Sequence, residues 1–197
     1  MWEMAENSDK TPANRPNCWG NEAVLIDRFN KGDESAFEQI MKENAADVAA
    51  LANRLLGWPG EVEDVVQNVF VKAFTGLRKF RRRSRLKTWL FAITINECRR
   101  HRRRQMLRLR LPAKAHRNLS SPAAFAGVMN GERLNRVRRA VLSLPAKYRE
   151  AVVLRYLQGL SMKQASEVLG ITVNALHVRL TRARQRLKRN LTGLLEE

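Results

Sequence analysis

The chain has 197 residues, 44% of them hydrophobic, so it can form one large domain or two small ones with buried cores and is not a disordered basic tail. Its formal net charge is +18, which indicates a polyanionic partner. Cys18 and Cys98 lie in no CxxC pair and beside no histidine cluster, so neither a disulfide framework nor a zinc site is expected.

The charge is distributed unevenly. Residues 1–77 carry 7 basic and 13 acidic side chains, a net charge of −6. Residues 78–117 carry 16 basic side chains and one acidic, a net of +15, and residues 118–197 carry 14 and 5, a net of +9. This distribution predicts two separate contacts with a polyanion and a different partner for the acidic beginning.

The first part of the chain has the pattern of a helical bundle. Residues 1–20 are polar, with two prolines, and are expected to form a mobile tail. Apolar residues at helical spacing predict helices from residue 25, over about 33–55 and over 61–74, where the buried stripe runs from Val62 to Phe74. A basic loop is expected over 78–87. The helix that follows has Leu86, Trp89, Leu90 and Ile93 facing inward and arginines toward its far end.

The helical pattern stops near residue 105. Prolines and serines predict a flexible linker over 105–131, and apolar periodicity returns over 132–197. We therefore predict an all-α fold: two small helical domains, 21–104 and 132–197, joined by a flexible linker. No apolar run reaches the ~18 residues of a membrane span, and MWEMAENSDK is no signal peptide, so a cytoplasmic protein without membrane insertion is expected.

Residues 161–189 predict a helix-turn-helix. Ser161 and Gln164 have the spacing of a capping box, and Gly170 suits the left-handed conformation that ends a helix. Thr172 can cap the second helix, whose outer face is basic. A helix, a glycine turn and a basic helix are typical of a motif that enters the DNA major groove.

Three blocks in this order resemble a known family. The blocks are GDESAFEQIMKEN with EVEDVVQNVFVKAF, then RLKTWLFAITINECRR, then LPAKYREAVVLRYLQGLSMKQASEVLGITVNALHVRLTRARQRL. They look like a bacterial RNA polymerase sigma factor of the extracytoplasmic-function (ECF) group. The resemblance implies a first domain that binds core polymerase and melts the minus-ten promoter element, and a second domain that reads the minus-thirty-five element as duplex.

The resemblance assigns the polymerase contact to the polar face of the helix over 61–74, through Asp64, Gln67 and Asn68. Such a face can meet a basic partner with complementary charge. Asn68 stands where relatives usually have a carboxylate. Without the resemblance, an acidic face would be explained more readily as a solvated helix face.

The resemblance assigns the minus-ten contact to the basic block and the helix after it. Asn96 is the better candidate for reading a base, and Trp89 is more readily explained as a core residue. The implied residues are Arg82, Arg83, Ser84, Lys87, Trp89, Asn96, Arg99, Arg100 and Arg103.

The minus-thirty-five contact is assigned to the second helix of the helix-turn-helix. Early positions of this helix face base edges and later arginines face the backbone, although Arg182 could also reach a guanine and His177 could instead face solvent. The implied residues are Asn174, His177, Val178, Arg179, Arg182, Arg184 and Arg186. His177 and Val178 differ from the usual residues of relatives, so the recognised sequence stays open.

No catalytic constellation is present, so the chain is not expected to be an enzyme, and no cofactor or metal is expected. The expected partners are core RNA polymerase and promoter DNA, together with an anti-sigma factor, which is common in this group. The alternative is a helix-turn-helix DNA-binding regulator that acts without being a polymerase subunit. Charge alone would also fit a structural protein of RNA or the nucleoid.

Overall fold

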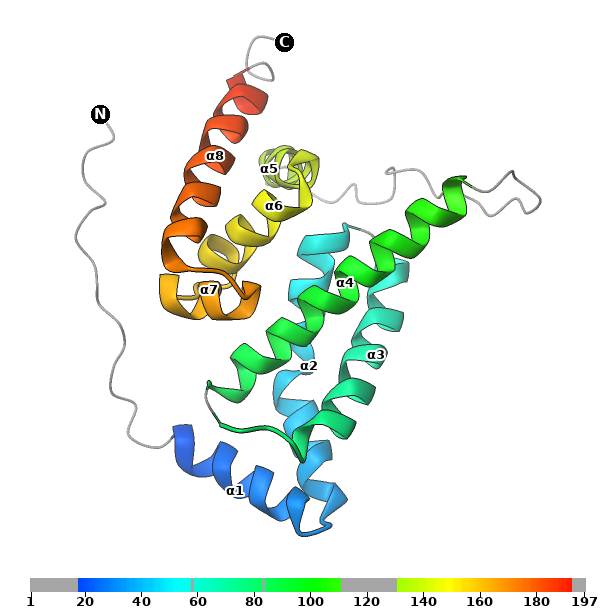
Figure 1. Ribbon diagram of the computed structural model, residues 1–197. Coiled ribbons are helices and arrows are strands. Elements are labelled where there is room, and N and C mark those ends of the chain that lie inside the picture. The colour runs from blue at the N-terminus through cyan, green and yellow to red at the C-terminus, as the bar shows by residue number, and fades with distance from the viewer. Residues whose placement is uncertain (1–17, 58, 83, 111–130, 193–197) are drawn as a thin grey trace.

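The computed structural model describes residues 18–57, 59–82, 84–110 and 131–192, and within these ranges every regular element is a helix (Figure 1). The all-α prediction is confirmed. In chain order the elements are α1 (Cys18–Asn30), α2 (Glu34–Leu56), α3 (Pro59–Leu77), α4 (Leu86–Arg110), α5 (Gly131–Ser143), α6 (Ala146–Val152), the π-helical turn η1 (Val153–Leu157), α7 (Met162–Leu169) and α8 (Val173–Thr192).

Several element boundaries differ from the sequence prediction. Helix α1 begins at Cys18, inside the segment that was expected to be tail, and α3 extends beyond the predicted 61–74 at both ends. Helix α4 continues to Arg110, inside the expected linker, in the stretch from Leu107 where the sequence allows a short continuation of the helix. Residues 1–17 and 111–130, the rest of the expected tail and most of the linker, lie outside the described residues. No helix in the described ranges is both long enough and apolar enough to cross a membrane.

Helix α2 is the centre of the first domain and is fixed at both ends by local chemistry. Asp33 caps its start by accepting a hydrogen bond of 3.0 Å from the backbone N–H of Ser35. Gly57 ends it in a left-handed conformation with φ of 85°. Helices α1, α3 and α4 all pack against α2, and its apolar face is buried.

Helix α4 is covered from two directions, because it packs on α2 and α3 of the first domain and on α7 of the second. Leu86, Leu90 and Phe91 are almost completely buried, whereas Trp89 and Ile93 are only half-buried. The predicted inner face is therefore confirmed at Leu86 and Leu90. Trp89 and Ile93 are buried less completely than predicted, and Phe91 is buried although the prediction did not include it. A helix that is covered on two sides buries more of its circumference than one stripe.

The helix-turn-helix is confirmed in its details. Ser161 accepts a hydrogen bond from the backbone N–H of Gln164 at 3.2 Å, and the Gln164 side chain accepts one from the backbone N–H of Ser161 at 2.9 Å. Gly170 ends α7 with φ of 65° and ψ of 38°, and Thr172 accepts from the backbone N–H of Ala175 at the start of α8. This corner is built from local signals that the sequence displays directly.

The two domains pack together around one continuous apolar core. Helix α7 packs against α4 (Figure 1), and α5 and η1 pack against α2. Buried residues of both domains form a single cluster, which runs from Leu25 in α1 to Ala183 in α8. The sequence analysis predicted two domains but did not predict that they share a core.

Cys98 lies inside this core, and burial raises the pKa of its thiol to about 12. Because the thiolate is the reactive form, a rise of about three pKa units lowers the thiolate fraction near pH 8 roughly a thousandfold. In a Cys18→Ser variant, we expect a thiol reagent to label Cys98 far more slowly in the native protein than in denaturant. Equal rates in the two states would contradict this burial.

Candidate nucleic-acid and polymerase interfaces

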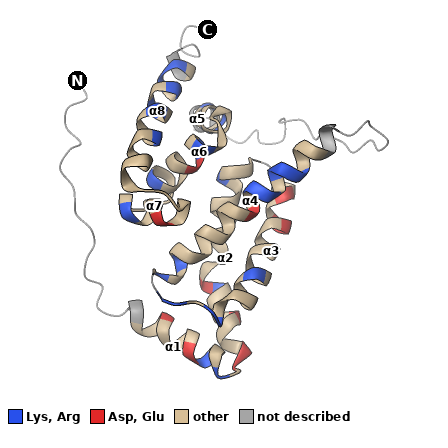
Figure 2. Cartoon of the chain, viewed as in Figure 1, with Lys and Arg blue, Asp and Glu red and all other residues tan. Residues whose placement is uncertain are grey.

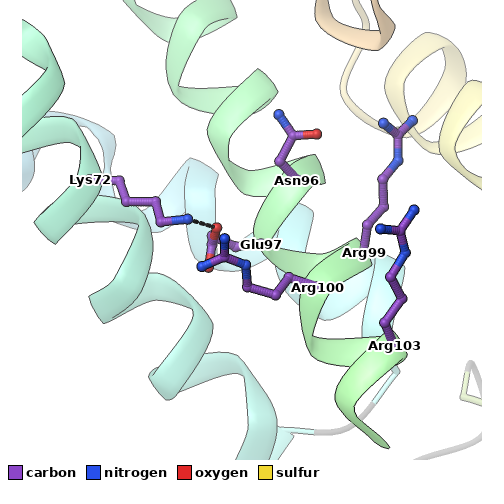
Figure 3. Close-up of a pocket in the computed structure, with 6 residues that line it drawn as sticks. All are labelled: Lys72, Asn96, Glu97, Arg99, Arg100 and Arg103. Carbon is purple, nitrogen blue, oxygen red and sulfur yellow. Dashed lines mark hydrogen bonds and ion pairs between the residues drawn. The ribbon is translucent and has the colours of Figure 1, made fainter. Parts of the chain in front are cut away.

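The second half of α4 carries an open basic face. Asn96, Arg100 and Arg103 are exposed there, at spacings of four and three residues that place them on one side of the helix. With Lys72 of α3 and the buried Glu97, they line a pocket of about 280 Å³ (Figure 3). Glu97 pairs with Lys72, so the arginines dominate the charge at the rim. This face suits a phosphate backbone, with an amide beside it that can bond a base edge.

The loop between α3 and α4 is tied to the acidic part of its own domain. Arg82, which has a φ of 52°, pairs with Asp27 of α1, and Lys87 pairs with Asp47 of α2. These four side chains are about half-exposed, and ion pairs of this kind contribute little to stability. Arg82 and Lys87 can therefore each release the carboxylate partner and bind a DNA phosphate instead. Ser84 is half-buried in the same loop, and the predicted contact Arg83 lies outside the described residues.

Trp89 packs against its own domain. Its ring lies 5.0 Å from that of Phe80, centroid to centroid. It also lies against Gly76, where a Cβ would come within 3.1 Å of Trp89 Cζ2. This placement favours the core role of Trp89 over stacking on a base.

Helix α8 presents two differently placed groups of predicted contacts, and Figure 2 shows its Lys and Arg residues as blue bands along its length. Its first turns expose Asn174, His177 and Val178, beside the half-buried Arg179. Further along, Arg182 bonds the Tyr148 hydroxyl and lowers its pKa, and Arg186 lies over the same ring at 5.4 Å; Arg184 is exposed. The early positions are thus open for base contacts, while Tyr148 orients two of the later arginines.

The predicted polymerase face of α3 is both polar and apolar. Asp64, Gln67 and Asn68 are exposed, and the Asn68 side chain donates a hydrogen bond of 2.6 Å to the backbone carbonyl of Asp64. Val71 follows on the same side of the helix and is 58% exposed, and Phe74 beside it is 37% exposed. Phe74 was predicted as part of the buried stripe, and Val71 was not singled out. An apolar centre beside polar groups is typical of a protein docking surface.

Arg99 has a partner that the sequence analysis did not predict. Its guanidinium donates to both carboxylate oxygens of Glu150 in α6, at 3.0 and 2.7 Å. Hydrogen bonding to Glu150 raises the pKa of Arg99. Glu150 comes from the second domain and carried no signal in the sequence beyond being an acidic residue in a helix. Arg99, one of the predicted minus-ten contacts, is thus engaged within the protein.

Two protein-family models match the chain. The model described as Sigma-70 region 2 matches residues 40–108, and the model described as Sigma-70, region 4 matches residues 134–187. The first match contains the faces of α3 and α4 described above, and the second contains α7 and most of α8.

Similar proteins match over almost their full length. The ECF RNA polymerase sigma-E factor of Escherichia coli (strain K12) is 32% identical over 182 residues, which is 87% of this chain and 95% of that protein. The ECF RNA polymerase sigma factor SigW of Bacillus subtilis (strain 168) is 28% identical over 86% of this chain and 96% of its own.

Solved structures show the same arrangement of helices. CnrH, in complex with the cytosolic domain of CnrY, matches with a TM-score of 0.66 and 28% identity over 88% of this chain and 98% of its own. The sigma factor RpoE of Bartonella quintana, in complex with the anti-sigma factor NepR, matches with a TM-score of 0.61 and 27% identity, over 79% and 96%.

Proposed function

The chain belongs to the ECF group of RNA polymerase sigma factors, and from this premise we propose how its residues divide the work of promoter recognition. The face of α3 around Asp64 and Gln67 binds core polymerase. The basic face of α4 holds the minus-ten element, and the first turns of α8 read the minus-thirty-five element. The observation that supports this division is the exposure of all three faces on separate helices, with a mixed polar and apolar face on α3 and basic faces on α4 and α8.

The two DNA faces suit different tasks. On α4, Asn96 stands beside Arg100 and Arg103, so an unstacked base can bond the amide while phosphates meet the guanidiniums. On α8, Asn174, His177 and Val178 precede the arginines, the order expected of a recognition helix in a major groove. Melting and duplex reading are thereby assigned to different domains.

The protein then acts as a binding subunit and not as an enzyme, in the cytoplasm where its polymerase partner works. In the described residues, no group of three or more His, Cys, Asp or Glu side chains could hold a metal ion. An anti-sigma factor is a further proposed partner, since RpoE of Bartonella quintana was solved with the anti-sigma factor NepR.

Reconstituted transcription tests this proposal. Core polymerase mixed with the protein should initiate at a promoter mapped from cells that overexpress it, and should not initiate without it. A helix-turn-helix regulator, in contrast, would bind its operator duplex tightly in the absence of polymerase. Failure to associate with core polymerase would contradict the proposed function.

Replacing Asp64 and Gln67 together by alanine should weaken binding to core polymerase about tenfold or more. Both side chains are exposed on α3, so the substitution removes interface groups without opening the core. Fewer than about a third of interface residues cost more than about 1 kcal/mol when truncated, and these lie near the centre of the interface, so a loss of this size is expected if the pair is central to the contact. Affinity can be measured by fluorescence anisotropy, with circular dichroism to verify unchanged helicity.

The matched control is Glu38→Ala with Gln39→Ala, which removes one carboxylate and one amide from an exposed part of α2. Its affinity for core polymerase should equal that of the wild type. If both double variants lose affinity equally, the contact does not lie on the α3 face.

A further inference from the structure

One aromatic ring gathers cations from two helices of the second domain. Tyr148 of α6 is only 6% exposed, and α6 packs against α8. The guanidinium of Arg186 in α8 lies over this ring at 5.4 Å from its centroid, and the ammonium of Lys147 in α6 lies over it at 5.1 Å. Arg182 of α8 donates a hydrogen bond to the hydroxyl oxygen of Tyr148. Three positive charges are therefore collected around one buried side chain.

These three positive charges are not balanced by acidic side chains. Lys147, Arg182 and Arg186 are all exposed. None of them forms an ion pair with an aspartate or glutamate of the described residues. Glu150, which belongs to the same helix as Lys147, is bonded to Arg99 of α4 instead. Cations that share one ring repel one another, so an anion bound among them would be stabilised.

Tyr148 holds the cations in place without neutralising them. The face of an aromatic ring attracts Lys and Arg, and a phenol oxygen accepts a hydrogen bond from a guanidinium. The hydrogen bond from Arg182 and the positive charges of Lys147 and Arg186 lower the pKa of the Tyr148 phenol. Side chains that are already ordered lose less conformational entropy when a ligand binds. The ring therefore prepares the cations for an anion.

The position of the cluster on α8 indicates which anion it binds. Arg182 and Arg186 are four residues apart, so they lie one turn apart on the same side of the helix. Val178, a proposed base contact, is exposed one further turn toward the start of α8. When a recognition helix lies in the major groove, side chains on its flank meet the phosphates at the edge of that groove. A phosphate of duplex DNA therefore fits the cluster.

We propose that Lys147, Arg182 and Arg186 form one phosphate-binding site beside the minus-thirty-five element, and that Tyr148 is its positioning residue. Lys147, which lies outside the helix-turn-helix, then contacts DNA directly, whereas Tyr148 acts through the arginines. The hydroxyl of Tyr148 draws Arg182 toward α6, which assigns this arginine to the DNA backbone and not to a guanine. The proposal rests on the function proposed above, because it adds a phosphate contact beside the base-reading turns of α8.

The first test is Lys147→Ala, with Lys42→Ala as the matched control. Lys42 is exposed on α2, so the control removes the same charge away from α8. Binding of the full chain to a mixed-sequence DNA duplex is measured by fluorescence anisotropy over a range of salt concentrations. Lys147→Ala should weaken binding about fivefold, which is the size expected of an exposed charge pair. The slope of log K against log salt should become shallower by about 0.9, the value of one phosphate contact on a duplex.

The control Lys42→Ala should leave this slope as in the wild type. A wild-type slope in Lys147→Ala, or the same change in both variants, would overturn the direct contact between Lys147 and a phosphate. Because Lys147 is exposed, its truncation opens no cavity, and circular dichroism should show unchanged helicity.

The second test separates positioning by Tyr148 from packing. Tyr148→Phe keeps the ring and removes the hydroxyl that holds Arg182, and it should weaken duplex binding about threefold, the size expected of one lost hydrogen bond. Tyr156→Phe is the matched control, because Tyr156 is the one other tyrosine and is 53% exposed. The control should bind as the wild type does. Equal affinities of the two variants would overturn the positioning role.

A spectroscopic readout follows the site itself. In Tyr156→Phe, Tyr148 is the sole tyrosine, so the ultraviolet absorbance of tyrosinate reports its ionisation alone. Its pKa should lie below the usual value of about 10 and should rise when Arg182 is replaced by alanine. Binding of the duplex should also raise this pKa, because a phosphate brings negative charge beside the phenol.

A tyrosine with a purely structural role would keep its pKa when the duplex binds, and that result would overturn the phosphate site. This measurement is made without substituting Tyr148, so it remains decisive if Tyr148→Phe fails to fold. These readouts need neither polymerase nor a promoter, so their outcome is independent of the transcription test of the proposed function.

Discussion

Replacing Arg100 and Arg103 together by alanine should weaken binding to single-stranded DNA about thirtyfold. Both guanidiniums are exposed on the pocket rim beside Asn96. An exposed charge pair contributes up to about 1 kcal/mol, so two of them account for a loss of this size. The dependence of affinity on salt gives a second and sharper readout. Each phosphate contact on a single strand adds about −0.7 to the slope of log K against log salt, so the slope should become shallower by roughly 1.4.

The control for this variant is Lys31→Ala with Lys42→Ala. It removes two exposed positive charges from the loop after α1 and from α2, away from the pocket of α4. If affinity depends only on net charge, both double variants will lose the same amount. A loss confined to the α4 variant, with the shallower salt slope, would place the phosphate contacts on this face. Equal losses would contradict it.

The parts of the fold that the sequence predicted are those encoded by neighbouring residues. The capping box of Ser161 and Gln164, the left-handed Gly170 and the apolar periodicity of α2 and α3 act within a few residues along the chain. Signals of this kind can be read without knowing the rest of the structure. The helix-turn-helix could for this reason be predicted with its caps as well as its helices.

The contact between the domains could not be predicted in the same way. It joins Arg99 to Glu150 and Arg149 to the carbonyl of Leu55, across 51 and 94 residues of sequence. Every residue has a backbone carbonyl, so the sequence does not show which carbonyl accepts a hydrogen bond from a distant side chain. An arginine that donates such a bond cannot be distinguished in the sequence from an arginine on the surface. The basic pattern of α4 therefore predicted DNA contacts for residues that the free protein also uses to hold its second domain.

The exposed side chains of α3 illustrate a further limit. Helical periodicity placed Phe74 on the buried stripe, and its ring does form edge contacts with Phe29 and Phe37 at 5.2 and 5.1 Å, yet 37% of the residue stays exposed. Periodicity gives the direction of a side chain and does not say where the neighbouring helix ends. The exposed apolar residues of the proposed polymerase face can be identified only with α1 and α2 in place.

Replacing Leu176 by alanine should destabilise the protein by about 2–5 kcal/mol, because a fully buried leucine leaves a cavity when it is truncated. Leu176 is 0% exposed and belongs to the core cluster that includes residues of both domains. For a chain of this size, such a loss lowers Tm by roughly 5–15 °C. Val178→Ala is the control, since Val178 is exposed on the same helix and its truncation should change stability by no more than about 0.5 kcal/mol.

The tryptophans make this substitution a test of the shared core. All four, Trp2, Trp19, Trp58 and Trp89, precede the second domain, so their fluorescence reports on the first part of the chain. If the two domains unfold as one cooperative unit, Leu176→Ala should lower the fluorescence midpoint as much as the midpoint seen by circular dichroism. An unchanged fluorescence midpoint would mean that the domains unfold separately. The core joining α4 to α7 would then be too weak to couple the unfolding of the two domains.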